Sequence, residues 1–166
     1  FQKALICSKK ILRNGHMTEL STLASEIANR RYPEFKFQIT EQWVRDYKTA
    51  IGLSYAQIAD NSFVPNSFVS CLRDAEFWVF ASLDMELSQL LHASQTYEFL
   101  TPIRVGDEIS SQSEVAKVSH KKGSRGEMIF VDIKNTFKRI SNNGVKEPAP
   151  VPLVHALMSV VVRPKQ

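Results

Sequence analysis

Residues 90–109 read LLHASQTYEFLTPIRVGDEI and form the most strongly patterned stretch of the chain. Apolar and polar side chains alternate over His92–Leu100, which is the pattern of a β-strand with one buried face. Pro102 and the pair Gly106-Asp107 follow, and both are typical of a tight chain reversal. We therefore expect a strand and then a turn, in which Asp107 accepts hydrogen bonds from backbone N–H groups.

Three segments after this stretch show the same alternation, namely Ile109–His120, Met128–Ile140 and Leu153–Arg163. The turn-forming sequences KKGSRG and SNNG lie between them. Consecutive strands joined by short connections predict an antiparallel meander. We expect the apolar residues of the last two segments to face the core: Ile129, Val131, Ile133, Phe137, Val154, Ala156, Met158, Val160 and Val162.

The chain before residue 90 is predicted to be mostly helical. Apolar residues fall on one helical face over Glu19–Arg31, and Pro33 ends that pattern. A short extended segment, Phe35–Ile39, then leads to Thr40. Thr40 is a good N-cap for a helix that closes at Gly52.

A further helix is predicted from Ser67 to about Leu83, after the stretch VPNS at 64–67. Its residues are apolar on nearly every side, and only Arg73, Asp74 and Glu76 interrupt them. A helix of that composition is typically buried. Together with the strands that follow, it predicts an α+β hot-dog fold, in which a curved antiparallel sheet wraps around one long buried helix.

Length, charge and cysteine content limit the class of protein. The chain has 166 residues, enough for one domain with its own core. Its net charge of +4 is mild and its lysines are spread along the chain, which argues against nucleic-acid binding. Cys7 and Cys71 lack the spacing of metal ligands, so we expect free thiols, no metal site and a cytoplasmic location.

Residues 1–16 are expected to lie outside the domain as a tag, a linker or another extension. The sequence Gly15-His16-Met17 resembles a cloning junction or an internal start, which leaves residues 17–166 as the single domain. The longest apolar run in this region, Ala4–Cys7, is far too short for a signal peptide core or a membrane span. We expect no association with membranes.

The order of these features resembles one known family. VPNSF at 64–68, a buried helix, LLHASQTYEFLTPIRVGDEI, hairpin strands and VVVR at 160–163 are similar to the MaoC-like acyl dehydratases. The resemblance covers roughly residues 32–164. It is closest to the N-terminal, FAS1-like dehydratase subfamily, which includes accessory subunits of mycobacterial hydroxyacyl-carrier-protein dehydratases. It implies binding of 3-hydroxyacyl or 2-enoyl thioesters of coenzyme A or acyl carrier protein, with no cofactor.

The same resemblance implies where catalysis would occur. Catalytic members carry Gly-Asp-x-Asn-Pro-x-His just after the first long helix, and the aspartate and histidine hold the water that is added or removed. Aligning the motif's glycine with Gly52 places Leu53 and Ile58 at these two positions, and neither can transfer a proton. Asp60, after a loop shift, and His92 are the remaining catalytic candidates, although a histidine at a strand start is more often structural.

A binding site for the acyl thioester is also implied. In the family, backbone N–H groups at the start of the buried helix polarise the thioester carbonyl, as a helix N-terminus is suited to do. The corresponding amides here are those of Asn66, Ser67 and Phe68. A plain helix start after a proline explains the same residues equally well.

The basic hairpin at Lys121, Lys122 and Arg125 is a candidate contact for the carrier. Its positive charge suits a phosphopantetheine, a coenzyme A phosphate or an acidic carrier protein. A hairpin tip with solvated charges is the alternative.

Three functions remain open on the sequence. The first is an accessory, acyl-binding subunit of fatty-acid or polyketide metabolism, which forms a homodimer or pairs with a catalytic MaoC-type chain because an open sheet edge is normally paired or covered. The second is a self-sufficient dehydratase or an acyl thioesterase with a non-standard site. The third is a non-enzymatic scaffold that binds acyl-CoA. We expect the first, since Leu53 and Ile58 replace the acid/base pair.

Overall fold

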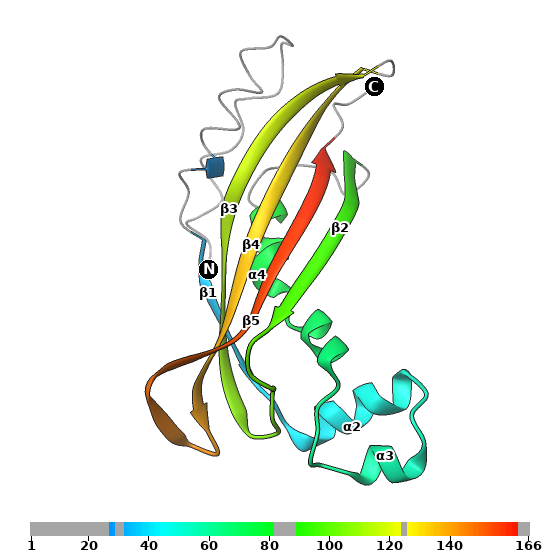
Figure 1. Ribbon diagram of the computed structural model, residues 1–166, viewed down its shortest axis with the longest axis vertical. Coiled ribbons are helices and arrows are strands. Elements are labelled where there is room, and N and C mark those ends of the chain that lie inside the picture. The colour runs from blue at the N-terminus through cyan, green and yellow to red at the C-terminus, as the bar shows by residue number, and fades with distance from the viewer. Residues whose placement is uncertain (1–26, 29–31, 82–88, 124–125, 163–166) are drawn as a thin grey trace.

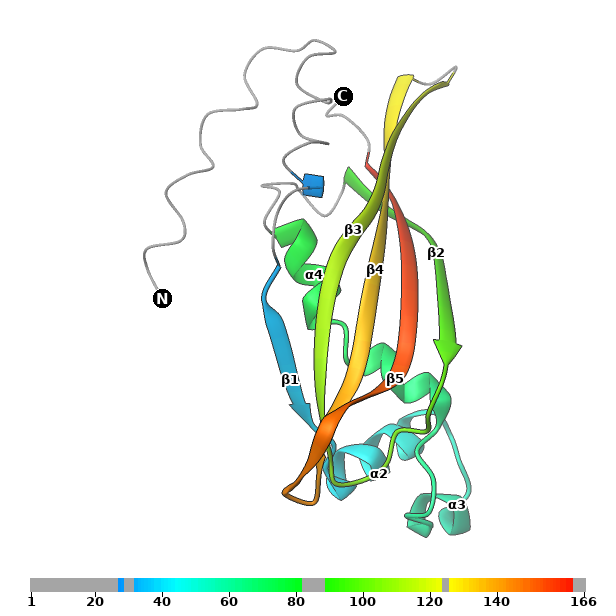
Figure 2. The same cartoon turned by 60° about the vertical axis from the view of Figure 1, so that its left-hand side comes forward.

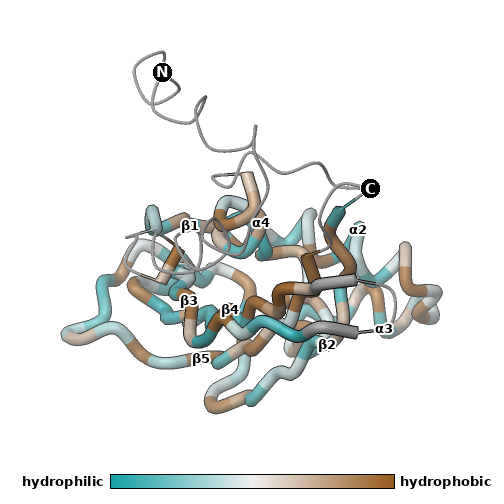
Figure 3. The backbone as a smooth tube through the Cα atoms, turned by 90° about the horizontal axis from the view of Figure 1, so that it is seen from above, coloured by the Kyte–Doolittle hydropathy of each residue, from teal (hydrophilic) through white to brown (hydrophobic). Residues whose placement is uncertain are grey.

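Figure 1 shows the computed structural model, which describes residues 27–28, 32–81, 89–123 and 126–162. A curved sheet lies against a set of short helices, and seen from above α4 lies on one side of that sheet (Figures 2 and 3). This arrangement confirms the predicted α+β hot-dog fold. The elements are β1 (Glu34–Gln38), α2 (Glu41–Ala50), α3 (Tyr55–Ala59), the 3-10 helix η1 (Asn66–Cys71), α4 (Asp74–Ala81), β2 (Leu90–Phe99), β3 (Asp107–Gly123), β4 (Gly126–Asn142) and β5 (Val145–Val162).

The described strands form one antiparallel sheet in the order β1-β3-β4-β5-β2. β3, β4 and β5 pair in succession, which confirms the meander for these three strands. Directly opposed residues share a face of the sheet, as Val131 and Val160 do. All nine apolar residues that were expected to face the core in β4 and β5 are buried, so the sequence pattern identified the inner face correctly.

The strand predicted at His92–Leu100 is present as β2, but its place in the meander was predicted wrongly, because β2 does not neighbour β3. It pairs with β5 over Leu90–Phe99 and forms one edge of the sheet. The connection at 100–106 makes this possible, since it can reach about 23 Å when extended, whereas three strand spacings require only about 14 Å. β3 therefore starts on the far side of the sheet, where it pairs with β1.

The predicted helix from Ser67 to Leu83 is interrupted in the structure. η1 ends at Cys71 and α4 begins at Asp74. Between them Leu72 has φ −103° and ψ 39°, outside the helical region. The Arg73 carbonyl then accepts the first hydrogen bonds of α4, so the chain starts a new helix instead of extending η1.

α4 is also less buried than predicted. Val79 and Phe80 pack toward the sheet, but Phe77 and Trp78 are 55% and 46% exposed. α4 is therefore not buried on every side. It has a second apolar face, which the described part of the chain leaves about half exposed.

The core consists of two apolar clusters along the inner face of the sheet, which we call the η1 cluster and the α4 cluster after the helix each contains. The η1 cluster comprises Ile39, Val44, Val64, Phe68, Val69, Leu72, Ile103, Ile109, Phe137, Leu153, Val154 and Ala156. The α4 cluster comprises Ile27, Tyr32, Val79, Phe80, Ile129, Val131, Ile133, Met158, Val160 and Val162. One domain usually has one contiguous core, so the boundary between these clusters is a distinctive feature.

α2 follows β1 as predicted. The hydroxyl oxygen of the N-cap Thr40 accepts a hydrogen bond from the Trp43 N–H at 3.2 Å. Gly52 follows the helix with φ +76°, the left-handed conformation that favours glycine. Trp43 and Tyr47 pack edge-on against Phe68, with ring centroids 5.1 and 5.2 Å from it. α2 thus packs against η1 at one end of the η1 cluster.

The extension at residues 1–16 and most of the predicted helix at Glu19–Arg31 lie outside the described residues. Ile27 is described and is 2% exposed in the α4 cluster, and its carbonyl accepts a hydrogen bond from the Tyr32 hydroxyl at 3.1 Å. Among the described helices none is long and apolar enough to cross a membrane.

Candidate functional site

The segment after Gly52 forms the short helix α3, which is held by capping and not by burial. The Ser54 side chain accepts from the Gln57 N–H, and the Gln57 side chain accepts from the Ser54 N–H, which makes a reciprocal capping box. No residue of α3 is buried. Leu53 and Ile58, at the two expected catalytic positions, are half-buried apolar residues of this ordered segment. They place no group here that can transfer a proton.

Lys48 of α2 contacts the residues that follow α3. This role of Lys48 was not predicted from the sequence. Its side chain is fully buried, and its Nζ donates to the Asp60 carbonyl at 2.5 Å. The same Nζ lies 4.0 Å from the centroid of the Phe63 ring. Lys48 follows the buried Val44 by one helical turn, a spacing that indicates the inner side of α2.

Asp60, one of the two catalytic candidates, terminates α3. Its carboxylate accepts from the Ser62 N–H at 2.8 Å. Hydrogen bonds from the Ser62 side chain and backbone hold the pKa of the exposed Asp60 carboxyl below its usual range. Asp60 therefore stays ionised and caps a turn, a state that does not suit a general acid at neutral pH.

His92, the other candidate, is near the start of β2. Its Nε2 lies 3.3 Å from Gln95 Oε1, and its side chain is exposed. β2 begins at the end of the sheet away from α2 and α3 and runs toward them (Figures 1 and 2). Asp60 and His92 therefore lie toward opposite ends of the molecule, and the fold does not bring them together as an acid/base pair.

Arg73, Glu76 and Gln95 form a polar cluster that the sequence did not predict. Arg73 Nε lies 2.7 Å from Oε2 of the fully buried Glu76. Gln95 of β2 donates to Glu76 Oε1 at 3.4 Å and accepts from Arg73 at 3.4 Å. His92 joins the cluster through Gln95. A connected set of polar groups thus runs from a buried carboxylate to the edge strand.

Phe77, Tyr97 and Met158 lie near this cluster, and an Arg73 Nη lies 2.9 Å from Met158 Sδ. The guanidinium carbon of Arg73 lies 5.0 Å from the centroid of the half-exposed Phe77 ring. Burial and the negative charge of Glu76 raise the pKa of the Tyr97 hydroxyl. Tyr97 therefore stays protonated at neutral pH and can donate a hydrogen bond. The signal that could have indicated this cluster is the presence of charged residues inside an apolar helix, since buried charges require partners.

The expected thioester contacts lie at the start of η1. Asn66 and Ser67 are exposed, whereas Phe68 is fully buried in the η1 cluster. The Phe68 N–H already donates to the Pro65 carbonyl at 2.9 Å. Within the structure this amide stabilises the chain, and contact of Asn66 and Ser67 with a thioester stays a prediction.

The basic hairpin lies between β3 and β4. Lys121 is exposed, and its Nζ lies 4.8 Å from the centroid of the Phe130 ring. The backbone of Lys122 is paired with that of Glu127, and Arg125 lies outside the described residues. Binding of a phosphate or carrier protein here remains a prediction.

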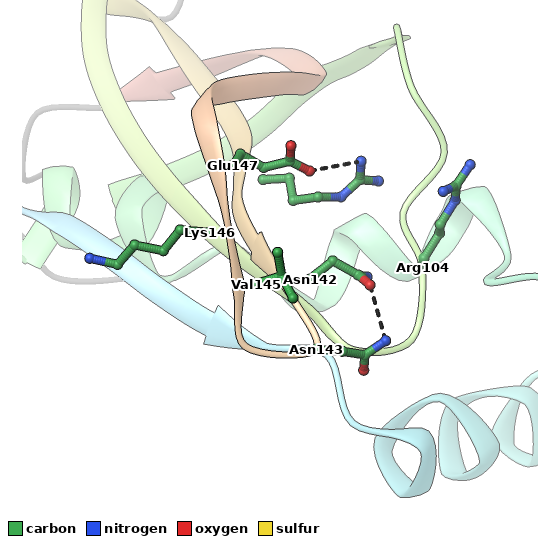
Figure 4. A pocket seen from close by; sticks show the side chains of 7 residues that line it. Arg104, Asn142, Asn143, Val145, Lys146 and Glu147 are labelled. Atoms are coloured by element: carbon green, nitrogen blue, oxygen red, sulfur yellow. Dashed lines mark hydrogen bonds and ion pairs between the residues drawn. The ribbon is translucent and has the colours of Figure 1, made fainter.

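An open pocket of about 430 Å³ lies near the β4–β5 turn (Figure 4). Val145 is the one apolar side chain in its lining, so the pocket is unsuited to an acyl chain, which requires mainly apolar walls. Figure 4 shows the side chains of Arg104 and Lys146 pointing to opposite sides. The lining residues are Arg104, Arg139, Asn142, Asn143, Val145, Lys146 and Glu147.

Asp107 accepts hydrogen bonds from three of the residues that line this pocket. It is fully buried, and its Oδ1 accepts from Arg139 Nε and from Asn142 Nδ2, each at 2.7 Å. Its Oδ2 accepts from the Arg104 N–H at 2.8 Å, which confirms the predicted backbone capping. The role is structural, because Arg139 and Asn142 hold the turn at 102–107 against β4 and the Arg104 N–H closes the turn itself.

Neither a reactive thiol nor a metal-binding cluster is found among the described residues. Burial raises the pKa of the free Cys71 thiol and outweighs a hydrogen bond from Ser70, so this thiol is a poor nucleophile at neutral pH. No group of three or more histidine, cysteine, aspartate or glutamate residues in the described ranges is arranged to hold a metal ion.

Solved structures with this fold include several hydratases and dehydratases. The ChsH1–ChsH2 complex of Mycobacterium tuberculosis matches with a TM-score of 0.67 and 10% identity, over 91% of this chain and 95% of that chain. The HadBC (3R-hydroxyacyl-ACP dehydratase) complex of the same organism matches with a TM-score of 0.58 and 16% identity, over 79% and 92%. The hydratase PhaJ1 of Pseudomonas aeruginosa matches with a TM-score of 0.54 and 14% identity, over 81% of each chain. At these identities the likeness establishes the fold.

The family follows from the sequence itself. No curated protein sequence matches the chain. The family model described as the FAS1-like dehydratase domain region matches residues 27–147, which is well over half of the chain. The protein therefore belongs to the FAS1-like dehydratase domain family.

Proposed function

We propose that this protein is a non-catalytic, acyl-binding subunit of a cytoplasmic (R)-3-hydroxyacyl thioester dehydratase. It pairs with a second hot-dog chain, which supplies the aspartate and histidine for addition or removal of water. The observation that carries this proposal is the segment after Gly52, where Leu53 and Ile58 occupy the expected catalytic positions.

The order of that segment supports the proposal. Its capping box and the contact of Lys48 with Asp60 hold it in one conformation without any acid or base at Leu53 or Ile58. A catalytic loop that had merely shifted would need to present Asp60 or His92 to the substrate. Asp60 caps a turn and His92 lies toward the other end of the molecule, so neither observation favours a self-sufficient enzyme.

The edge strand β2 supports pairing with another chain. Among the described strands β2 has a neighbour on one side only, and an unpaired edge is a template for a strand of another chain. Leu91, Phe99 and Leu100 are 48%, 42% and 45% exposed along or just after this edge. Phe77 of α4 extends the apolar surface through its contact with Arg73, which also bonds Gln95 of β2. The neighbouring HadBC and ChsH1–ChsH2 structures are complexes, which favours a partner subunit.

Turnover by the separate and the combined chains tests the proposal. The purified protein is expected to show essentially no hydration of crotonyl-CoA or of longer enoyl-CoA thioesters. Addition of the hot-dog chain encoded by the neighbouring gene, if it carries an intact Gly-Asp-x-Asn-Pro-x-His motif, should give activity. Robust hydration by the pure chain would contradict the proposal.

The position of the interface has its own test. Leu91→Glu places a charge on the edge strand and should weaken association with the partner by at least about tenfold. Leu157→Glu is the matched control. Leu157 is 45% exposed on β5, which lies between β4 and β2, so this variant should leave association nearly unchanged. Sedimentation velocity of the two chains measures both. Equal weakening by the two variants would place the interface elsewhere.

A further inference from the structure

A row of four residues crosses the inner face of the sheet at the boundary between its two apolar clusters. Ser113 of β3 is paired with Asn135 of β4, Asn135 with Ala156 of β5, and Ala156 with Tyr97 of β2. Directly opposed residues share a face, so all four side chains belong to the inner surface. We call them the polar row, although Ala156 contributes only a methyl group.

The polar row accounts for the division of the core. On β4, Phe137 belongs to the η1 cluster and Ile133 to the α4 cluster, and Asn135 lies between them. On β5, Ala156 belongs to the η1 cluster and its inner-face neighbour Met158 to the α4 cluster. The boundary therefore follows the row from strand to strand. It is a built feature of the sheet and not a single misplaced polar residue.

Two polar groups in this row have no hydrogen-bond partner among the described residues. Asn135 is fully buried and Ser113 is 3% exposed. Asn135 Oδ1 accepts from the Ser111 hydroxyl at 3.0 Å, but Asn135 Nδ2 and Ser113 Oγ make no hydrogen bond to the described part of the chain. Buried polar groups in folded proteins are nearly always paired with protein, water or a ligand. A donor and a hydroxyl are thus left unsatisfied side by side.

The other end of the row reaches the edge strand. Tyr97 is half-buried, keeps its proton at neutral pH, and lies close enough to Glu76 and Arg73 to be affected by their charges. Between Tyr97 and Asn135 the row carries only the small side chain of Ala156. No long side chain of the sheet therefore separates the edge at β2 from the unpaired amide.

We infer that Asn135 Nδ2 and Ser113 Oγ bind an oxygen atom carried part of the way along a bound acyl chain. The substrate class is then acyl thioesters with a hydroxyl or oxo group beyond the reacting carbons. The Asn135 amide donates to either oxygen, and the Ser113 hydroxyl donates to an oxo group or accepts from a hydroxyl. A methylene at this position satisfies neither group. This inference rests on the proposed function, because it takes the inner face of the sheet as the place of the acyl chain.

Binding of matched thioesters tests the inference. Pairs of acyl-CoA molecules of equal chain length, one saturated and one with a single mid-chain hydroxyl or oxo group, are titrated calorimetrically into the protein in complex with its partner. The oxygenated member should bind about tenfold more tightly. Moving the oxygen along the chain should give one preferred position.

Variants identify the residues responsible. Asn135→Leu should bring the two affinities to within about twofold of each other, and Ser113→Ala should reduce the preference without adding volume. Ser141→Ala is the matched control, because Ser141 is equally buried on β4 but bonds Glu108 outside the row. It should retain the full preference. Ser113→Ala also keeps the test open if Asn135→Leu fails to fold.

The outcomes separate this inference from the proposed function. Equal affinity of the wild-type protein for both thioesters, at every oxygen position, would mean that only water satisfies Asn135 and would overturn the inference alone. The same holds if Asn135→Leu and Ser113→Ala leave the preference intact. Failure of all acyl thioesters to bind, with the partner present, would overturn the proposed function and this inference with it.

Discussion

Two ion pairs with the same N–O distance have different surroundings in this fold. Arg139 with Asp107 and Arg73 with Glu76 are both 2.7 Å apart, and both carboxylates are fully buried. Asp107 accepts three short hydrogen bonds, and the Arg139 side chain is only 8% exposed. Glu76 has one short bond from Arg73, whose side chain is 22% exposed, and one long bond from Gln95.

The difference shows which polar groups remain available. The donors at Asp107 are all used in holding the turn at 102–107 together and against β4. We therefore call Arg139–Asp107 the closed pair and Arg73–Glu76 the open pair. Glu76 lies beside the edge strand, where Gln95 leads on to the exposed His92. A buried carboxylate alone therefore does not indicate a functional site, and the number and length of its hydrogen bonds is the better guide.

The largest expected effect is at the closed pair. Arg139→Met leaves Asp107 buried without its cation, which typically costs about 3–5 kcal/mol. Urea denaturation at neutral pH measures this loss in free energy of unfolding. Lys138→Met, at the adjacent exposed position of β4, serves as control and should change stability by less than about 0.5 kcal/mol. A loss at Arg139 no larger than this would show that Asp107 does not depend on the pair.

A smaller loss of stability is expected at the open pair. Arg73→Met should cost about 2–3 kcal/mol, because Arg73 is partly solvated and Glu76 keeps its bond to Gln95. The same variant should weaken association with a partner chain, whereas Arg139→Met, where it remains folded, should not. Measuring association by sedimentation velocity decides this. Equal effects of both variants on association would show that the Arg73–Glu76 pair is no nearer to the partner chain than the Arg139–Asp107 pair.

Gly106 precedes Asp107 of the closed pair, and its substitution is expected to cost less stability than the loss of Arg139. Gly106 has φ +88°, and a Cβ there would lie 2.2 Å from Asn143 Oδ1. Gly106→Ala should therefore cost about 2 kcal/mol in thermal or urea unfolding. Gly52→Ala is the control with a similar φ of +76° and no atom within 4 Å, and it should cost about 1 kcal/mol. Equal losses would mean that Asn143 moves aside freely.

The smallest expected effect is the change with pH in the stability that Tyr97, near the open pair, contributes to the folded protein. Burial and Glu76 raise its pKa above the ordinary value of about 10. Above that pH the unfolded chain loses the proton while the folded chain keeps it, so the stabilisation is complete below about pH 10 and is lost as pH rises through the folded pKa. The difference in unfolding free energy between wild type and Tyr97→Phe should therefore fall above pH 10.

Charge substitutions provide the control for this titration. Glu76→Gln should lower the pKa of Tyr97, since it removes a negative charge that favours the neutral phenol. Glu98→Gln, on the exposed opposite face of β2, should not move it. Absorbance titration of the tyrosines records both. A shift in Glu98→Gln alone would place the responsible charge on the outer face.

Local features of the fold could be predicted from the sequence because local patterns determine them. The buried face of β4 and β5 follows from strict alternation, and the cap at Thr40 and the left-handed Gly52 follow from residue type. The position of β2 could not be predicted, since its pairing with β5 depends on contacts far apart in sequence. The break after Leu72 was missed because periodicity does not distinguish one helix from two in succession.

The residues of the candidate site likewise fall into those that the sequence predicts and those that only the structure shows. The sequence shows that Leu53 and Ile58 cannot transfer a proton, and their assignment to the acid/base positions stays a prediction. The bonds of Lys48, Glu76 and Asn135 could not be predicted, because a polar residue on an apolar face has no partner in the linear sequence. In the sequence Arg73 and Glu76 are only interruptions of an apolar helix. The structure shows that they form a cluster because both bond to Gln95 on β2.

The place of β2 in the sheet also determines the order in which the molecule can assemble during synthesis. Among the described strands β2 pairs with β5 alone, and β5 leaves the ribosome after every other strand of the sheet. Until then β2 has no neighbour, and its apolar Leu91 and Phe99 are open to unwanted contacts. Pairing of such distant segments is slow, so β2 docks late. Recognition of a second subunit through β2 would therefore be restricted to chains whose β5 has already folded.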